Sequence, residues 1–339
     1  MIDCIFTIDY EIYGNGEGSL SDLVCDPAQK LISIFDNLGV RFVPFIEVAE
    51  FEMIESAGSD PDIDLVKQQI RYFNEKGFEI GLHLHPQWYN AEFSDGRWDL
   101  DYSEYNLCAL SEKRISEIVN RGLGYLQNIL GIPGFVPISF RAGNWLLQPT
   151  SVVASILAEQ GIKIDSSVFK GGMQYKYGLD YRQSLKNGYY WKFDDDVNVY
   201  SEKGVLIEVP IYTQIVPFWK MLTGKRLTMQ KKSKSSSGLH VGRLERIRDY
   251  LRLGYPLKFD FCRMTLRELV TMMEVVIRED RCDSTIYRPL VAIGHTKDLV
   301  DPDTVEAFLG YLQEENIRIS TFAESLDKCT SEMNKKLMS

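Results

Sequence analysis

The sequence predicts an α/β protein with a barrel-like, parallel β/α architecture. Three observations lead to this prediction. Short apolar runs alternate with segments of helical spacing along most of the chain, and short polar clusters follow several of the apolar runs. The length of 339 residues is common for an undivided (β/α) barrel. Recurring strand-then-helix units indicate a parallel sheet, either open or closed, and we favour the closed form.

The first quarter of the chain contains three predicted strands. Each strand is a short apolar run, and the helices between them carry apolar residues at helical spacing. Gly39 and Gly77 follow two of these helices, and glycine commonly ends a helix. In chain order we expect a strand at 2–8, a helix at 26–38, a strand at 41–46, helices at 48–55 and 63–76, and a strand at 78–84.

The rest of the chain continues the alternation with two interruptions. A long amphipathic segment precedes the next strand, and Gly161 stops the helix that comes after it. We expect a helix at 110–130, a strand at 135–140, a helix at 149–160, strands at 162–164 and 205–209, a helix at 266–277, a strand at 290–293, a helix at 302–315, a strand at 317–320 and a final helix.

These elements predict one catalytic domain over residues 1–330, followed by a C-terminal tail at 331–339. Segments at about 86–106 and 169–256 are longer than normal connections. We interpret them as insertions, because long loops tend to be functional or mobile. No Pro- or Gly-rich linker with a change of composition divides the chain into two halves.

Composition narrows the protein class. Residues 1–9 carry acids and lack the basic and apolar regions of a signal peptide. No stretch approaches the roughly 18 apolar residues that a membrane helix needs, and the six cysteines include no C-x-x-C pair. We therefore expect a reduced, cytoplasmic protein. The formal net charge of −10 argues against nucleic-acid binding.

One segment departs from this acidic balance. Residues 220–248 contain nine cations and one anion, and apolar residues from Val216 onward precede them. One interpretation is a solvated excursion, since charge blocks usually face solvent. The other is a patch over 216–248 that binds phosphate or makes peripheral contact with the inner membrane face.

His83 and His85 are two of only four histidines, and they stand at the end of the strand predicted at 78–84. Side chains two apart on a strand leave the same face, so both imidazoles could bind one metal ion. The alternative is a pair of polar residues that face solvent or cap a turn.

Five polar clusters follow predicted strands, at 7–11, 83–85, 139–145, 165–167 and 294–298. The carboxyl ends of the strands form the active face of a (β/α) barrel, so we expect the clusters to converge. Taken singly, each has a local explanation: carboxylates cap loops or helices, an arginine forms a surface ion pair, and a histidine ends a strand.

The converging residues suit metal-assisted hydrolysis. A divalent ion held by two imidazoles and a carboxylate lowers the pKa of bound water to about 7 and polarises the substrate carbonyl. Asp9 and Glu11 are two apart, so one can ligate the metal while the other acts as base. Arg141 would keep the base ionised, and His295 can protonate the leaving group.

The order of these clusters resembles that of the polysaccharide deacetylase family, the NodB-homology hydrolases, and indicates a divergent member. The matching segments are 7–9, 79–83, 140–143, 164–168 and 293–295, and the resemblance covers about 1–168 and 204–330. It implies a distorted (β/α) barrel with loop insertions. It also implies that Asp9 is the base, Arg141 its partner, His295 the general acid and His83 a metal ligand.

Two positions depart from the family pattern. Gln87 stands where the second histidine ligand is expected, so His85 would have to replace it. Tyr10 stands where the second aspartate is expected, which leaves Glu11 as the carboxylate ligand. The resemblance therefore implies a divalent metal, with zinc expected first and cobalt, nickel or manganese as alternatives, bound by Glu11, His83 and His85.

The resemblance implies removal of an N-acetyl or O-acetyl group from a sugar in bacterial cell-surface polysaccharide or glycolipid synthesis. We expect a carbohydrate substrate, phosphate-linked in one version of this hypothesis, and contacts to it from Trp88, Trp145 and Asp165. Packing of the aromatic insertion onto the barrel is an equal alternative for Trp88. A small-molecule amide hydrolase and a non-catalytic glycan- or partner-binding barrel are the competing functions, and the oligomeric state is left open.

Overall fold

The computed structural model describes residues 1–217 and 254–338 and contains one large curved sheet. Its strands are β1 (Ile2–Tyr10), β2 (Val43–Glu47), β3 (Gly81–Leu84), β6 (Ser139–Ala142), β7 (Ile164–Asp165), β10 (Trp191–Phe193), β11 (Leu206–Glu208), β14 (Arg288–His295) and β15 (Arg318–Ile319). The order is β10-β11-β7-β6-β3-β2-β1-β14, with β15 beside β1. Only β10, of the strands in this sheet, pairs antiparallel.

Residues outside the named strands close this sheet into a distorted barrel. Ile211 forms parallel bridges with Phe169 on one side and with Val291 of β14 on the other. Asp260 adds a further bridge to Ile293. The prediction of a distorted (β/α) barrel is therefore confirmed, and the strand ends that carry the polar clusters meet at one end of it.

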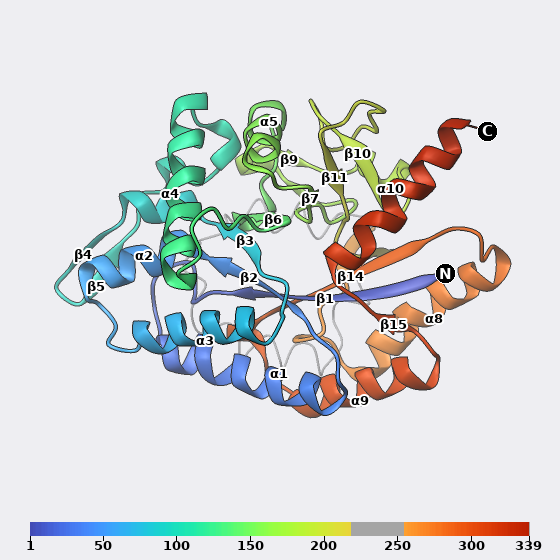
Figure 1. Cartoon of the computed structure of the whole chain (residues 1–339), viewed down its shortest axis with the longest axis horizontal. Coiled ribbons are helices and arrows are strands. Elements are labelled where there is room, and N and C mark those ends of the chain that lie inside the picture. Colours follow the sequence, from blue (N-terminus) through green and yellow to red (C-terminus); the bar gives the residue numbers. More distant parts are fainter. Residues whose placement is uncertain (218–253, 339) are drawn as a thin grey trace.

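Helices surround the curved sheet (Figure 1). They are α1 (Asp26–Asn37), α2 (Val48–Ala57), α3 (Ile63–Glu75), α4 (Glu112–Leu130), α5 (Ser151–Gln160), α8 (Leu266–Cys282), α9 (Pro302–Glu314) and α10 (Phe322–Met338). Helices α1, α3, α8 and α9 lie below β1 and β14 in the view of Figure 1, and α4 and α5 lie above them. Local signals start and stop these helices: Thr265 and Glu268 form a capping box on α8, and Gly161 ends α5 in a left-handed conformation.

The two predicted insertions contain short hairpins. The first holds β4 (Glu92–Ser94) and β5 (Arg97–Asp99), joined by Asp95 and Gly96, whose φ angles are 50° and 73°. Positive φ at both central residues is the requirement of a type I′ turn, and Asp-Gly meets it. The second insertion holds β8 (Met173–Gln174) paired with β9 (Leu179–Asp180), and β12 (Thr213–Val216) paired with β13 (Tyr255–Lys258). The basic segment 220–248 lies outside the described residues.

Two strands begin later in the chain than the sequence predicts. The strand expected from 78 begins at Gly81, because the Phe78 N–H donates to the Phe73 carbonyl and completes the end of α3. The strand expected from 135 begins at Ser139, because Ile132 and Phe135 form a hydrogen-bonded turn after α4. Apolar residues in both stretches pack against the core from a turn, which periodicity alone does not distinguish from a strand.

The central strands form the middle of the core. All nine residues of β1 and all eight of β14 are buried, as expected for parallel strands covered on both faces. The Phe6 ring of β1 packs edge-to-face against Phe35 at 5.3 Å and against Phe261 at 5.1 Å between centroids. These contacts fix β1, which carries two of the predicted site residues at its end.

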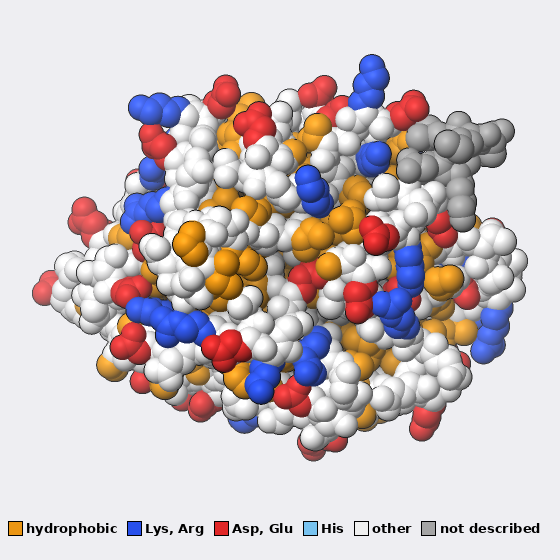
Figure 2. Space-filling model, in the orientation of Figure 1, with side chains coloured by type: hydrophobic (Ala, Val, Ile, Leu, Met, Phe, Trp, Pro, Cys, Tyr) orange, Lys and Arg blue, Asp and Glu red, His pale blue; other side chains and the backbone are white. Residues whose placement is uncertain are grey.

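The described surface mixes charges of both signs. Figure 2 shows acidic and basic side chains interspersed over one face, with apolar groups between them. Among the helices of the described residues, none combines the length and the apolar character that crossing a membrane requires.

Candidate active site

Neighbouring parallel strands bring the predicted site residues to one end of the barrel. In the sheet register Asp9 of β1 lies opposite His295 of β14, and His83 of β3 lies opposite Arg141 of β6. Glu47, the last residue of β2, lies opposite His83. All five side chains are buried. Residues almost 290 positions apart in the chain therefore share one small region.

Asp9 and Arg141 form a buried ion pair. Arg141 Nη1 lies 2.5 Å from Asp9 Oδ1, and its Nη2 donates to Thr7 Oγ1 at 3.0 Å. Arg141 Nε donates to the Ser166 carbonyl at 2.9 Å, so the guanidinium is held on three sides. Burial alone would raise the pKa of Asp9, but Arg141 and the two nearby histidines lower it below its ordinary value. Asp9 is therefore ionised and oriented, as a general base must be.

His295 faces the other oxygen of the same carboxylate. Its Nε2 lies 3.4 Å from Asp9 Oδ2, and its Nδ1 lies 3.6 Å from Asp298 Oδ2. Burial lowers the pKa of His295 below its ordinary value, although Asp9 and Asp298 oppose this shift. The imidazole is therefore mostly neutral at pH 7 and can take up a proton from its neighbour.

Glu11, His83 and His85 form a compact set of donor atoms. Glu11 Oε2 lies 3.4 Å from His83 Nε2 and 3.1 Å from His85 Nε2. The two imidazole rings are perpendicular, with 4.8 Å between centroids. One ligand atom of each residue lies within 4.8 Å of the others. A carboxylate and two imidazoles at this spacing match the donor set of catalytic zinc sites.

The hydrogen bonds of the two histidines differ. His83 Nδ1 lies 2.8 Å from the Arg141 carbonyl, which can only accept, so His83 donates there and directs Nε2 toward Glu11. Burial lowers the pKa of His83, but Asp9 and Glu11 raise it to about 9, so a metal ion would have to displace the Nε2 proton. His85 Nδ1 faces the amide nitrogens of Gln87 and Asn144, each at 3.2 Å. Gln87 Oε1 has no hydrogen-bond partner among the described residues. A half-turn of the Gln87 amide would give His85 Nδ1–H an acceptor and free its Nε2, so the donor set fits a divalent ion.

Gln87 thus contacts His85 instead of pointing at the donor set. It is buried, and it follows His85 in a short 3-10 turn over Pro86–Asn90. The sequence left open whether His85 or Gln87 would be the third ligand, and the geometry favours His85. Gln87 is better placed to orient that imidazole through its other nitrogen.

Lys297 is a site residue that the sequence reasoning did not single out. Its Nζ lies 2.7 Å from Glu11 Oε1 and 2.7 Å from the Ile12 carbonyl oxygen. Burial would raise the pKa of Glu11, but Lys297 and the histidines hold it well below its ordinary value. The available signal was its position, two residues after His295 in the polar cluster that follows the last core strand.

Two further buried carboxyl groups stand behind this set. Glu47 caps helix α2: its Oε1 accepts from the backbone nitrogens of Ala49 and Glu50 at 3.0 and 3.1 Å. Glu50 Oε1 accepts from the Ile12 nitrogen at 2.8 Å. Burial raises the pKa of Glu47 and of Glu50, so these groups favour the neutral form more than Glu11 does. The hydrogen bond from the Ile12 nitrogen to Glu50 joins α2 to the segment that follows β1.

The predicted contact of Asp165 with substrate is not supported. Asp165 is fully buried, and its two oxygens accept from the backbone nitrogen and the hydroxyl of Ser167 at 2.9 and 2.8 Å. Ser167 Oγ in turn accepts from the Ala142 nitrogen at 2.8 Å. Asp165 therefore braces the backbone next to Arg141 and does not face an open space.

The two tryptophans predicted to contact substrate have different surroundings. Trp88 is 1% exposed and packs edge-to-face against Trp98 at 5.1 Å, so its ring cannot lie against a sugar, and that prediction is wrong. The insertion packs onto the barrel through it. Trp145 is only partly buried, and its ring meets the His295 ring edge-on with 6.1 Å between centroids. Trp145 keeps the predicted position beside the site.

A strained turn positions Trp145. The turn Gly143–Trp145 follows β6, and Asn144 and Trp145 both have positive φ, 55° and 61°. Non-glycine residues pay for this conformation with roughly 1–3 kcal/mol each, and such strain concentrates at functional sites. Gly143 is required for packing, because a Cβ there would lie 2.5 Å from the Leu84 carbonyl and 2.8 Å from His85 Cγ. The turn therefore fits tightly against His85.

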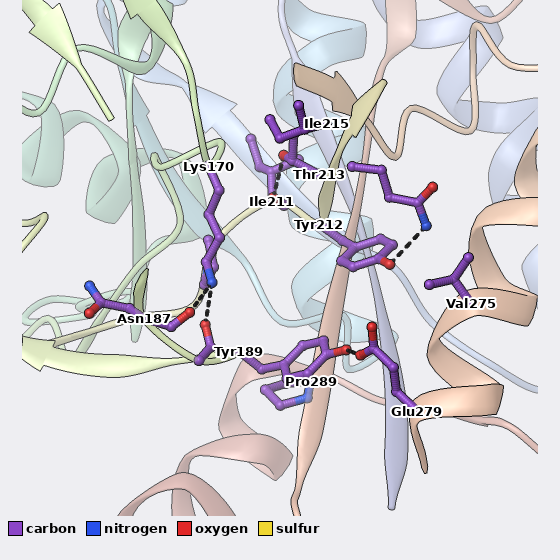
Figure 3. A pocket seen from close by; sticks show the side chains of 13 residues that line it. Lys170, Asn187, Tyr189, Ile211, Tyr212, Thr213, Ile215, Val275, Glu279 and Pro289 are labelled. Atoms are coloured by element: carbon purple, nitrogen blue, oxygen red, sulfur yellow. Dashed lines mark hydrogen bonds between the residues drawn. The ribbon is translucent and has the colours of Figure 1, made fainter. Parts of the chain in front are cut away.

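A cavity of about 430 Å³ lies away from these residues. Its lining includes Lys170, Tyr189, Glu279 and Pro289 (Figure 3), and Pro289 is at the opposite end of β14 from His295. Lys170 donates to two backbone carbonyl oxygens, and the Tyr189 hydroxyl donates to Glu279. Its polar groups thus bond to one another, and none of the predicted site residues lines it.

Comparison with known proteins identifies the fold. No protein-family model matches this chain, and no curated protein matches it. A Mycobacterium smegmatis crystal structure named as a polysaccharide deacetylase does match, with a TM-score of 0.53 and 15% identity over 97% of this chain and 90% of that one. The fold is that of the polysaccharide deacetylases. At this identity the likeness establishes the fold alone.

Enzymes with other reactions share the same architecture. A GH57 branching enzyme from Thermococcus kodakaraensis matches with a TM-score of 0.54 and 11% identity over 96% of this chain and 71% of that one. A 4-α-glucanotransferase from Thermococcus litoralis matches with a TM-score of 0.52 and 12% identity over 96% of this chain and 40% of that one. The reaction must therefore be argued from the site residues.

Proposed function

We propose that this protein is a metal-dependent hydrolase that removes an N-acetyl or O-acetyl group from a sugar. The observation that carries the proposal is the arrangement around Asp9. The Asp9 carboxylate is held by Arg141 and faces His295. Glu11 directly after β1, His83 on β3 and His85 directly after β3 form the neighbouring donor set. Base, proton carrier and candidate metal ligands thus occupy one end of a deacetylase-type barrel.

The cofactor we propose is a divalent ion, with zinc first and cobalt, nickel or manganese as alternatives. Glu11, His83 and His85 would hold it. When bound, such an ion lowers the pKa of a water molecule to about 7 and polarises the acetyl carbonyl. Lys297 would hold the second oxygen of Glu11 and so fix the orientation of its carboxylate.

Asp9 is the proposed general base. It accepts the proton of the attacking water, and its ion pair with Arg141 keeps the carboxylate ionised before the reaction. Arg141 is also stacked over the Phe45 ring, 4.2 Å from its centroid, which limits its freedom to follow another partner. The pair therefore positions the base as well as setting its charge.

His295 is the proposed proton donor to the leaving group. Its neutral imidazole lies 3.4 Å from Asp9, so it can receive the abstracted proton and pass it to the leaving amine or alkoxide. Trp145, which packs against the His295 ring, offers an apolar surface for the acetyl group or the sugar. We therefore expect the substrate to approach from the side of His295 and Trp145.

We propose an N-acetylated sugar of bacterial cell-surface polysaccharide or glycolipid synthesis as the substrate, in the cytoplasm or at the inner membrane face. The resemblance of the motifs and of the fold to polysaccharide deacetylases supports a carbohydrate. Residues 1–330 would act as one catalytic domain, and the segment predicted as a tail continues α10, where Met333 is buried and Glu332 Oε2 accepts from the Tyr190 hydroxyl at 2.8 Å.

The test joins metal content to product release. Wild-type protein loaded with Zn, Co or Ni is expected to release acetate from at least one N-acetylated sugar or sugar nucleotide. His83→Ala and His85→Ala should lower both the bound metal, measured by elemental analysis, and the acetate released. Equal metal in all three proteins would overturn the ligand set, and no acetate from any such substrate would overturn the deacetylase assignment.

One contact favours a second candidate, a barrel that binds a glycan or a partner without turnover. The Lys297 ammonium already neutralises Glu11 at 2.7 Å, which weakens the attraction of that carboxylate for a metal. In that case the protein would bind a sugar with no metal present, and Lys297→Met would raise its affinity for zinc. A substoichiometric metal content together with unchanged sugar binding after chelation would decide for this candidate.

A further inference from the structure

Lys258 lies beside the proposed active site, and within residues 1–217 and 254–338 its ammonium forms no ion pair. It is the last residue of β13, and its Nζ lies 3.0 Å from the centroid of the Trp145 ring and 4.9 Å from that of Phe169. The same Trp145 ring packs edge-on against His295. The ammonium group is therefore separated from the proposed proton donor by a single aromatic side chain.

The contacts of Lys258, which is half-buried, differ from those of two other half-buried lysines. Lys297 pairs with Glu11 at 2.7 Å, and Lys170 donates to two backbone carbonyl oxygens. In the described parts of the chain, 1–217 and 254–338, the recorded contacts of the Lys258 ammonium are with aromatic rings alone. Cation–π contacts hold the ammonium in place but leave its N–H donors free for a ligand.

The charges around Lys258 make this arrangement costly. Burial lowers the pKa of Lys258 to about 7; Asp260 and Asp9 oppose the shift, while Arg263 and Arg141 reinforce it. Partial removal from water without a direct ion-pair partner destabilises the charged form of the amine, so a bound anion would stabilise that form. Perturbed lysines of this kind concentrate at functional sites.

We infer that Lys258 binds an anionic substituent, a phosphate or a carboxylate, on the sugar that this site accepts. The inference rests on the proposed function and names its substrate class. Trp145 would pack against the sugar ring, and Lys258, which lies on that indole, would donate to the anionic oxygens. The described part of the chain thus supplies its own recognition of a charged sugar, independent of the basic segment.

Binding, not turnover, is the direct test. Isothermal titration of the metal-loaded protein would use N-acetylglucosamine, N-acetylglucosamine 1-phosphate and N-acetylmuramic acid, which differ in charge. A hydrogen bond to a charged group contributes about 1.5–3 kcal/mol, so wild type should bind one anionic sugar about 10–100-fold more tightly than the neutral one. The phosphate and the carboxylate arms show which anion is preferred.

Two variants of Lys258 and one control isolate the contact. Lys258→Met, which keeps the length of the side chain, should reduce the preference to less than about twofold while binding of N-acetylglucosamine is unchanged. Lys258→Arg should keep most of the preference, because it keeps the charge. Lys170→Met removes another half-buried ammonium, one that donates to the carbonyl oxygens of Asn187 and Gly188, and should leave the preference intact.

The outcomes separate this inference from the proposed function. A preference that survives Lys258→Met, or a wild type without any preference, overturns the role of Lys258 even if acetate is released. A preference that disappears in Lys258→Met, with no acetate released from any of the three sugars, supports the anion contact and counts against the deacetylase. Thermal unfolding of each variant checks that a lost preference does not reflect a lost fold.

Discussion

Two pairs of buried carboxyl groups lie at strand ends of the same barrel, and their pKa values are shifted in opposite directions. Asp9 and Glu11 end β1, and each has a cation, Arg141 and Lys297 respectively, within 2.7 Å. Burial raises their pKa values, but the cations bring both below the ordinary range.

Asp165 and Glu208 lie side by side at the ends of β7 and β11. Among the described residues, no cation forms an ion pair with either one. Burial raises the pKa of Asp165, and burial together with Asp165 raises that of Glu208 still further.

The comparison shows that burial alone does not decide the charge of a carboxyl group. Both pairs are removed from water, and the presence of a fixed cation decides which pair ionises. The ionised pair suits proton abstraction and metal binding, whereas the second pair can share a proton and brace the backbone. Glu208 Oε1 accepts from the Val168 nitrogen at 3.1 Å, in line with such a structural role.

Neutralising one carboxylate in each pair should give the largest contrast. Asp9→Asn keeps an acceptor for Arg141 but removes the base, so acetate release should fall about 10²–10⁴-fold. Asp165→Asn should lower the rate less than about tenfold, because Asp165 takes no proton from the reaction. Steady-state acetate assays on both variants measure this, and equal losses would remove the functional distinction between the pairs.

Removing the cation of the first pair should lower the free energy of unfolding. Arg141→Met leaves Asp9 buried without a partner, and breaking a buried pair in this way costs about 3–5 kcal/mol in the free energy of unfolding. Urea unfolding measures the loss.

The matched control is Arg141→Met combined with Asp9→Asn, which removes the unpaired carboxylate charge. The double variant should recover part of the lost stability, since the main cost is an unpaired charge. A double variant as unstable as Arg141→Met alone would mean that packing of the guanidinium on Phe45 dominates.

Substitutions of a proposed metal ligand and of its neighbour should weaken zinc binding to different extents. His83→Ala removes a ligand and should abolish stoichiometric zinc, whereas Gln87→Ala loses only the group that orients His85 and should weaken zinc binding about 10–100-fold. Competition with a chromophoric chelator measures both affinities. If Gln87→Ala bound zinc as wild type does, the orienting role of Gln87 would be excluded.

Asp165 and Glu208 should have a smaller effect on the free energy of unfolding, and this effect should depend on pH. The folded pKa of Glu208 lies well above its ordinary value of 4.5, so the folded state binds a proton that the unfolded state has released above pH 4.5. Stability from this group is full below pH 4.5 and is lost as pH rises toward the folded pKa, by about 1.4 kcal/mol per pH unit.

Glu208→Gln tests this sign, because the amide has no proton to release as pH rises. The free energy of unfolding should fall less between pH 5 and 8 in the variant than in wild type. Glu202→Gln, at an exposed position, is the control and should leave the pH dependence unchanged. A wild-type slope that Glu208→Gln does not reduce would exclude the shared proton.

Much of the fold was predictable because its signals are local. The alternation of apolar runs and amphipathic segments identified the strands and helices of the barrel, and the motif order indicated the deacetylase type. The errors arose where local pattern is ambiguous. Phe78 and Phe135 are apolar, yet they lie in turns whose hydrogen bonds depend on the preceding helix.

The candidate site was predictable in part. Asp9, His83, Arg141 and His295 were found because each follows a strand, and the structure brings them together as expected, although their roles stay predictions. Trp88 was assigned to the substrate as part of the aromatic insertion and Asp165 as part of a strand-end cluster, but Trp88 packs against Trp98 and the Asp165 oxygens accept from Ser167. Lys297 and Lys258 carried too little signal in the sequence, because their meaning depends on partners far away in the chain.

The sequence by itself determined most strands of the barrel, though not β10, and that their polar ends would meet, because side-chain periodicity and strand order are contained in short segments. Only the tertiary structure decided which carboxyl groups are ionised, which histidine nitrogen is free and which lysine lacks an anion. Those properties depend on burial and on charges contributed by distant strands, and no local pattern contains them.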